Sequence, residues 1–252
     1  DVYKRQGKWF VVIDGVEGKE YDGIGEEGVV FNPDGRRFAY VAKQGGKWFV
    51  VIDGVEGKEH DGIGNVVFSS DGRRYAYTAE REGKWFVVID GTEGKEYDGV
   101  GNVAFSSDGR RYAYTAERDG KWFVVIDGTE GKEYDEIGEG SLVFSPDGNR
   151  YGYEAERGEK WFVVIDGIEG KEYDWVYSIA FSPDGRWYVH GAMRDDKHLL
   201  VVDGVESKEY DKFIYYELIP QIKLVFDSPT KLHTLALRGL QFLLLEIEIV
   251  EN

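Results

Sequence analysis

Apolar and polar positions alternate along this chain in a short, repeated order that predicts β-strands. Within residues 64–98, a short apolar run at 65–69 is followed by an alternating segment at 74–78 whose two tyrosines share one face. A run that is apolar on both faces follows at 85–89, and a short polar segment at 95–98 ends the unit. We therefore expect four short strands joined by tight turns in each unit, and no segment has helical periodicity.

The same unit recurs along most of the chain. Residues 46–82 and 83–119 are nearly identical, and the phrase Gly-Lys-Trp-Phe-Val-Val-Ile-Asp-Gly returns, with small changes, every 37 or 39 residues. Its tryptophan stands at Trp9, Trp48, Trp85, Trp122 and Trp161, and residues 197–200 are a degenerate sixth copy. A fixed period of this length indicates repeated supersecondary units.

The repeat predicts an all-β fold, a six-bladed β-propeller with four-stranded antiparallel blades. A strand that is apolar on both faces must be covered on both sides, and radially arranged sheets provide that cover. Six copies of the first strand set the blade number; they centre on Phe31, Phe68, Phe105, Phe144, Phe181 and Phe226. A single domain over residues 1–252 is expected, with blades at about 23–61, 62–98, 99–135, 136–174, 175–211, and 212–252 closed with 7–22.

Closure of the last blade by strands from both termini leaves one strand too many. The third strand of the unit is found both at residues 9–13 and near the C-terminus, at 242–249. One blade holds only one of them, so the surplus strand is free to pair with another molecule. We therefore expect a monomer or a weak dimer.

Two recurring phrases carry a family resemblance. Phe-Ser-Pro-Asp-Gly at 144–148 and 181–185, followed by a Tyr-x-Tyr strand and by Trp-Phe-Val-Val-Ile-Asp-Gly, resembles the WD-like repeats of TolB-type β-propellers. The likeness covers roughly residues 7–252, although the Gly-His and Trp-Asp dipeptides of strict WD repeats are absent and residues 225–230 depart most from the pattern. The resemblance implies a module that binds proteins or peptides, or one that accompanies a catalytic domain as in prolyl oligopeptidase-like enzymes.

Charge narrows the range of partners. The formal net charge is −17, which argues against nucleic acid and against anionic membrane surfaces, because both require clustered Lys and Arg. The same charge favours a basic protein or peptide partner. No run is long and apolar enough to span a membrane. Residues 1–6 do not predict a signal peptide and are typical of the end of a translated metagenomic fragment, so we expect the natural start to be missing and the compartment is left open.

Candidate catalytic and metal-binding groups are few. The chain has no cysteine and no Gly-x-Ser-x-Gly nucleophile motif. His60, His190 and His198 replace recurrent aromatic residues of the repeat and are interpreted as packing substitutions. Asp-Gly pairs recur in two turns of each unit, where calcium binding is the alternative to a role in forming the turn. We expect no catalytic residue, no metal site and no cofactor.

Function is expected where the copies differ. The loop that leads into the first strand is short and has no aromatic residue in three copies, but it gains aromatic residues in the fifth and sixth copies. Aromatic side chains beside acids suit a basic or aromatic peptide, since they give contact area at low entropic cost. The predicted ligand-binding residues are Asp174, Trp175, Tyr177, Tyr215, Tyr216 and Glu217.

The leading hypothesis is a non-catalytic binding or scaffold module that recognises a peptide or protein at the channel mouth formed by these loops. A carbohydrate-binding protein, or a hydrolase or lyase using the same mouth, is one alternative. A structural repeat protein without a small ligand is another, in which the aromatic residues of the two loops only fill space where the blades close.

Overall fold

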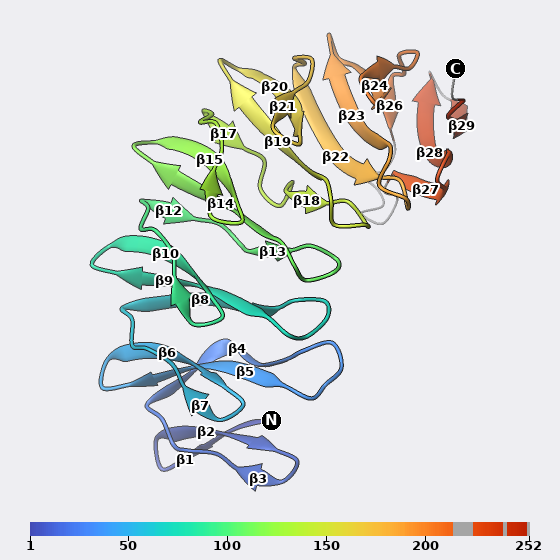
Figure 1. Cartoon of the computed structure of the whole chain (residues 1–252). Coiled ribbons are helices and arrows are strands. Elements are labelled where there is room, and N and C mark those ends of the chain that lie inside the picture. Colours follow the sequence, from blue (N-terminus) through green and yellow to red (C-terminus); the bar gives the residue numbers. More distant parts are fainter. Residues whose placement is uncertain (214–223, 239–240, 251–252) are drawn as a thin grey trace. The chain divides into compact units, whose positions relative to one another are not determined.

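The computed structural model describes residues 1–213, 224–238 and 241–250, and every regular element within them is a β-strand (Figure 1). The chain divides into two compact units, Asp1–Gly120 with Val124–Thr129, and Lys121–Phe123 with Glu130–Asn252. No helix in the described ranges could cross a membrane.

The first four sheets follow one another in chain order. A three-stranded sheet, β1-β2-β3, is followed by β4-β5-β6-β7, by β8-β9-β10-β11, and by β12-β14-β15-β16 with β13 also paired to β14. The strands are β1 (Val2–Arg5), β2 (Lys8–Ile13), β3 (Val16–Glu17), β4 (Gly23–Phe31), β5 (Phe38–Gln44), β6 (Lys47–Ile52), β7 (Val55–Glu56), β8 (Gly62–Phe68), β9 (Tyr75–Arg81), β10 (Lys84–Ile89), β11 (Thr92–Glu93), β12 (Gly99–Val100), β13 (Ala104–Phe105), β14 (Tyr112–Arg118), β15 (Lys121–Ile126) and β16 (Thr129–Glu130).

Three further sheets complete the described chain. Their orders are β17-β19-β20-β21 with β18 on β19, β22-β23-β24-β25, and β26-β28-β27 with β29 on β28. The strands are β17 (Glu136–Ile137), β18 (Val143–Phe144), β19 (Tyr151–Arg157), β20 (Lys160–Ile165), β21 (Ile168–Glu169), β22 (Trp175–Phe181), β23 (Tyr188–Arg194), β24 (Lys197–Val202), β25 (Val205–Glu206), β26 (Lys212–Phe213), β27 (Val225–Ser228), β28 (Lys231–Arg238) and β29 (Gln241–Glu248).

The all-β class and the repeated antiparallel sheets predicted from the sequence are confirmed. Six of the sheets contain a copy of the first strand, and neighbouring strands run antiparallel, as between β9 and β10. The core lies between successive sheets of a unit. One cluster joins Ala39 and Val50 of one sheet to Tyr77 and Phe86 of the next, all almost fully buried. Both faces of the central strands are therefore covered, as their apolar pattern requires.

Two-residue hairpins set the strand register. Asp53 and Gly54 have φ angles of 51° and 83°, both in the left-handed region, and they join β6 to β7. Positive φ at both central residues defines a type I′ turn, whose twist matches that of antiparallel strands. The same turn at Asp90 and Gly91 places the fourth strand of that repeat at β11, immediately after the Asp-Gly pair. The sequence analysis predicts this strand at residues 95–98 instead. Tyr97 instead makes a single bridge to Trp85 and is buried.

The predicted closure of the last blade by residues 7–22 stays a prediction. Within its own sheet, β2 pairs with β1 on one side and with β3 on the other. Residues 1–6, set apart from the repeat in the sequence analysis, supply β1. A local partner across the two-residue turn Gln6-Gly7 costs less chain entropy than a distant one. In the described chain, β26 to β29 pair with one another, so each copy of the third strand has its own sheet.

Candidate functional site

Asp174 belongs to a clamp that is also found in four earlier repeats of the described chain. One carboxylate oxygen accepts a hydrogen bond from Lys160 Nζ at 2.6 Å, and the other accepts one from the backbone N–H of Asp195 at 2.8 Å. The hydrogen bond from Lys160 is the main cause that lowers the pKa of Asp174. The same pair of contacts is made by Asp22, Asp61, Asp98 and Asp135. The carboxylate of Asp174 therefore links two successive sheets.

Trp175 is the exposed member of the predicted set. It opens β22, is 38% exposed, and lies with its ring centroid 4.6 Å from that of Trp161 on β20. Trp161 is 5% exposed, and its counterparts in the preceding repeats are less buried. The two indoles thus form an aromatic pair with Trp175 on the outside.

Tyr177 is buried, and its hydroxyl lies 2.8 Å from Nδ1 of His198. Burial raises the pKa of Tyr177. Its cross-strand partner is Gly191, which leaves room for the ring. In an earlier repeat the sizes are reversed: a Cβ added to Gly64 would lie 2.3 Å from Oγ1 of Thr78. A large residue on one strand is thus matched by a small one opposite.

The remaining predicted residues, Tyr215, Tyr216 and Glu217, lie outside the described residues. The structure brings Asp174, Trp175 and Tyr177 together at the start of β22, but only Trp175 presents a large exposed side chain. Ligand binding by these residues stays a prediction.

Two acids beside the indole pair were missed by the sequence analysis. Glu136 on β17 is directly opposite Glu156 on β19, and Glu156 is directly opposite Trp161 on β20. Like charges directly opposite each other destabilise a sheet. Burial, followed by the charges of Glu136, Asp135 and Glu159, raises the pKa of Glu156. We call Glu136, Glu156, Trp161 and Trp175 the tryptophan–acid surface. Its signal was Glu136, which stands where earlier repeats have glycine.

In the first two repeats, a lysine lies beside the tryptophan at the position that Glu156 occupies. Lys43 occupies the position of Glu156 in an earlier sheet, and its Nζ lies 4.9 Å from the ring centroid of Trp48. Lys4 lies over Trp9 in the same way, at 5.0 Å. A cation over an indole face is favourable, most of all where the site is shielded from water. Replacement of the lysine by Glu156 leaves a negative charge beside the indole pair.

Glu154 is a further unexpected group. It stands where other copies have Val41, Thr78 or Thr115, and burial raises its pKa to about 7, although a hydrogen bond from the backbone of Ser178 opposes the shift. Ser178 has a φ of 59° at an irregularity in β22, where register shifts between Tyr177 and Ala180. A carboxyl group with this pKa exchanges a proton near neutral pH.

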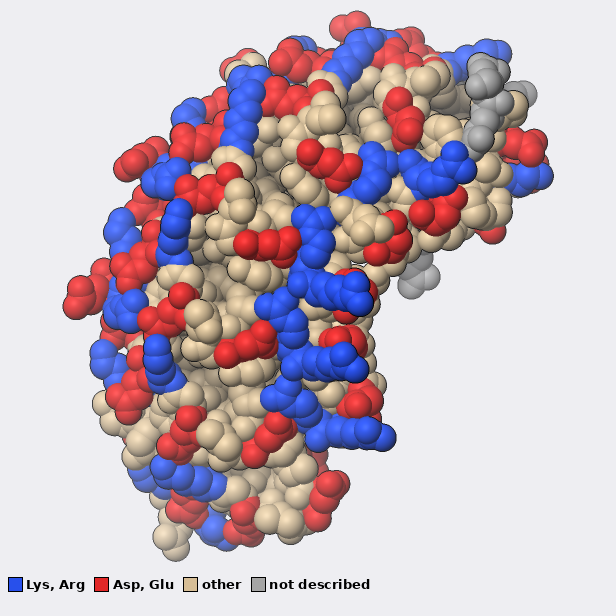
Figure 2. All heavy atoms as spheres, viewed as in Figure 1, with Lys and Arg blue, Asp and Glu red and all other residues tan. Residues whose placement is uncertain are grey.

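Charged residues elsewhere are largely paired. Figure 2 shows Lys and Arg side chains interspersed with Asp and Glu over the visible face. Arg194, for example, donates to both Glu206 and Glu209 at 3.1 Å, and the hydrogen bonds from Lys171 and Arg194 lower the pKa of Glu206 to about 2. In the described part of the chain, no three His, Asp or Glu side chains are grouped as a metal site would require.

Comparison with known proteins agrees with this repeat structure. The family "WD domain, G-beta repeat" matches residues 164–203. The predicted resemblance to WD-like repeats is confirmed at this repeat. No curated protein sequence matches the chain.

The similar solved structures include proteins that are described as β-propellers. TolB from Acinetobacter baumannii is 18% identical, with 80% of this chain and 60% of that chain covered and a TM-score of 0.39. The β-propeller domain of the Trilobed protease from Pyrococcus furiosus, described as having an open velcro topology, is 14% identical, with coverages of 91% and 83% and a TM-score of 0.46. The acylaminoacyl peptidase of Pyrococcus horikoshii is 13% identical, with coverages of 86% and 44% and a TM-score of 0.41. The chain thus spans less than two thirds of TolB and of the peptidase.

Proposed function

We propose that this WD-like repeat protein is a non-catalytic binding module that captures a basic peptide or protein segment on the tryptophan–acid surface. The observation that carries the proposal is the pair of facing carboxylates, Glu136 and Glu156, beside the indoles of Trp161 and Trp175. WD-type repeats commonly mediate interactions between proteins, and the match at residues 164–203 supports such a role.

A bound cation would relieve the repulsion between Glu136 and Glu156. A lysine or arginine side chain from a partner would neutralise the two acids and would contact the exposed face of Trp175. An internal lysine already fills the equivalent position beside Trp48. The raised pKa of Glu156 indicates that its negative charge is disfavoured in the free protein, so a bound cation would lower that pKa. Binding is expected to weaken with added salt.

A fluorescein-labelled peptide of alternating lysine and alanine tests the proposal by fluorescence anisotropy, with a glutamate–alanine peptide as the reference. Trp175→Ala and the double variant Glu136→Gln with Glu156→Gln should each weaken binding about tenfold, since each removes a cation–π contact or a charge pair. Glu80→Gln is the matched control, because Glu80 occupies the position of Glu156 in a repeat where glycine stands opposite. If the double variant binds as tightly as the unmodified protein, or if Glu80→Gln weakens binding equally, the proposal is wrong.

A further inference from the structure

A groove with acids on its wall lies between two complete sheets of the first compact unit. It has a volume of 410 Å³, and its lining residues come from the sheets β4-β5-β6-β7 and β8-β9-β10-β11. The half-buried side chains of Val41 and Trp48 line it together with the exposed residues Glu26, Glu27 and Asn65. A mostly apolar pocket of this size with a few polar groups is typical of a ligand-binding site. We call it the glutamate groove.

An insertion in β4 supplies the two acids. At its irregularity, β4 has residues 25–28 between the paired positions, whereas β8 has only residues 64–65 at the equivalent place. Gly28 has a φ of 68°, in the left-handed region, which allows the longer bulge to rejoin the strand. Successive residues of a regular strand face opposite sides of the sheet, but in this bulge Glu26 and Glu27 both line the groove.

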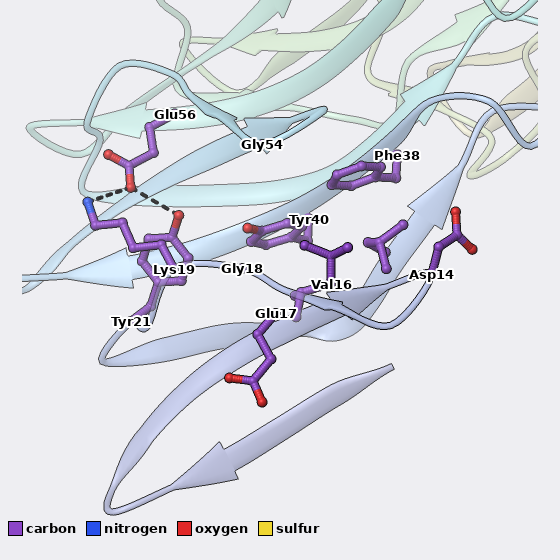
Figure 3. Close-up of a pocket in the computed structure, with 12 residues that line it drawn as sticks. Asp14, Val16, Glu17, Gly18, Lys19, Tyr21, Phe38, Tyr40, Gly54 and Glu56 are labelled. Carbon is purple, nitrogen blue, oxygen red and sulfur yellow. Dashed lines mark hydrogen bonds and ion pairs between the residues drawn. The ribbon is translucent and has the colours of Figure 1, made fainter.

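Neither glutamate is neutralised by the protein itself. The carboxylates of Glu26 and Glu27 have no hydrogen bond or ion pair in the described part of the chain. An acid that lines the neighbouring groove is different, because Glu56 accepts hydrogen bonds from Lys19 at 2.7 Å and from Tyr21 at 3.0 Å (Figure 3). The glutamate groove therefore carries two negative charges that are available to a ligand.

The fourth repeat has a similar insertion but fills the space beside it. Glu139 occupies the position of Glu26, and its carboxylate has no partner among the described residues either. Glu154 occupies the position of Val41, and its carboxylate lies against the bulge, since a Cβ added to Gly138 would lie 2.9 Å from its Oε2. Only the first of these two bulges thus lies beside an apolar wall.

We propose that the glutamate groove binds the side chain of a lysine presented by a partner protein. Its ammonium group is held by Glu26, Glu27 and Asn65, and its methylene groups lie against Val41 and Trp48. An ammonium has three N–H donors that point in different directions, which suits two separate carboxylates and an amide oxygen. A guanidinium suits a single carboxylate better, because its donors lie in one plane.

Charge and space favour a partner protein over a second copy of this chain or a free amine. The net charge of −17 opposes self-association and attracts basic segments. A volume of 410 Å³ exceeds the space that one lysine side chain fills, so the groove also has room for the backbone that carries it. Lys43 lies 4.9 Å from the ring centroid of Trp48, but it makes no ion pair with Glu26 or Glu27.

The proposal does not depend on binding at the tryptophan–acid surface. The residues of that surface belong to the second compact unit, whereas the glutamate groove belongs to the first. The two sites are therefore tested with separate variants and separate signals.

NMR titration of the full chain tests the groove, because the backbone amide signals of Gly64 and Asn65 report on it directly. The ligand is a capped peptide with one lysine between alanines, and a peptide with norleucine in place of lysine keeps the alkyl chain without the charge. The protein variants are Asn65→Ala and the double variant Glu26→Gln with Glu27→Gln. Glu139→Gln is the matched control, since it removes the equivalent acid of the fourth repeat. Circular dichroism checks the folding of each variant.

The lysine peptide should shift both signals with a Kd of about 1 mM or lower. The norleucine peptide and the double variant should each bind about tenfold more weakly, because each loses charge-assisted hydrogen bonds, and Asn65→Ala should bind about threefold more weakly. Glu139→Gln should leave the affinity within about twofold.

Three results would overturn the proposal. One is an unchanged affinity in the double variant of Glu26 and Glu27, and another is equal binding of the norleucine and lysine peptides. The third is the absence of a saturable shift with the lysine peptide at about 10 mM. If diaminopentane shifts the signals under those conditions and the lysine peptide does not, the occupant is a free amine, and the assignment to a partner protein is wrong.

Discussion

His60 is a weak point in the core that one substitution should repair. It is 3% exposed, and neither of its ring nitrogens has a hydrogen-bond partner in the described part of the chain. The ring packs edge-on against Phe86, with centroids 5.4 Å apart. Tyrosine occupies the same position in neighbouring repeats, where Tyr21 donates to Glu56 at 3.0 Å and Tyr173 donates to Glu206 at 3.0 Å. Histidine therefore leaves two buried polar atoms where the repeat usually places one satisfied hydroxyl.

The expected gain follows from these contacts. His60→Tyr removes two unsatisfied buried atoms, which cost about 1–3 kcal/mol, and it places a hydroxyl where it can donate to Glu93. Part of the gain is offset because Glu93 already accepts from Lys58 and Arg81, each at 3.1 Å. A net increase of about 2 kcal/mol in the free energy of unfolding is expected, which raises the melting temperature by about 4–8 °C in a protein of this size.

The neighbouring repeat provides a reciprocal control. Residues 46–82 and 83–119 are nearly identical, so Tyr97→His introduces the same side chain into almost the same surroundings. Urea unfolding followed by tryptophan fluorescence should show stabilisation by His60→Tyr and destabilisation of similar size by Tyr97→His. If His60→Tyr has no effect or destabilises the protein, the unpaired ring nitrogens of His60 do not lower the free energy of unfolding by the amount given above. A neutral Tyr97→His would refute the reasoning equally.

The other predictions concern pH, a turn and a coupled pair. Burial lowers the pKa of His190 to about 4. The free energy of unfolding should therefore fall by about 3 kcal/mol as the pH falls from about 6.5 to 4, because the unfolded chain takes up a proton first. His190→Tyr should remove this part of the pH dependence of urea unfolding. Burial raises the pKa of Glu154 to about 7, so stability should fall as the pH rises from about 4.5 through 7, and Glu154→Gln should remove a loss of about 3 kcal/mol measured in the same way. Asp196 has a φ of 58° where Gly83 and Gly120 stand in two earlier repeats, and Asp196→Gly should raise stability in thermal unfolding by about 0.5–1 kcal/mol. Tyr177→Gly and Gly191→Thr should each destabilise the protein, while the double variant should recover at least about 1 kcal/mol in a double-mutant cycle, since it restores the pairing of Gly64 with Thr78.

Periodicity predicted most of the fold because it reports directly on burial. The run at residues 85–89 is apolar on both faces, and Phe86, Val87 and Val88 are all almost fully buried. The predicted fourth strand begins three residues after the observed one, because Lys95 and Glu96 were interpreted as part of a polar edge strand. The turn chemistry of Asp90-Gly91, where both φ angles are positive, decides that register and is stronger evidence than the polar pattern.

The candidate site was harder to predict, because a difference between repeats does not reveal whether it serves packing or binding. Tyr177 was selected as an aromatic residue gained in a loop, yet its ring is buried opposite Gly191. The loss of bulk at Gly191 was visible in the sequence, but strand register was needed to pair it with the gain at Tyr177. Glu136 was visible in the same way, and only the sheet showed that it faces Glu156.

This distinction gives a physical criterion for function in near-identical repeats. A substitution whose change in size or charge is matched by its cross-strand neighbour maintains the fold, as Tyr177 and Gly191 do. A substitution that leaves its neighbour with an uncompensated charge costs stability, and it is retained only where something else offsets that cost. Glu136 is of this second kind because its partner is another carboxylate, whose pKa is raised by burial and by that charge. Because Glu136 and its partner Glu156 are both acids, the ligand that we propose for them is a basic segment of another protein.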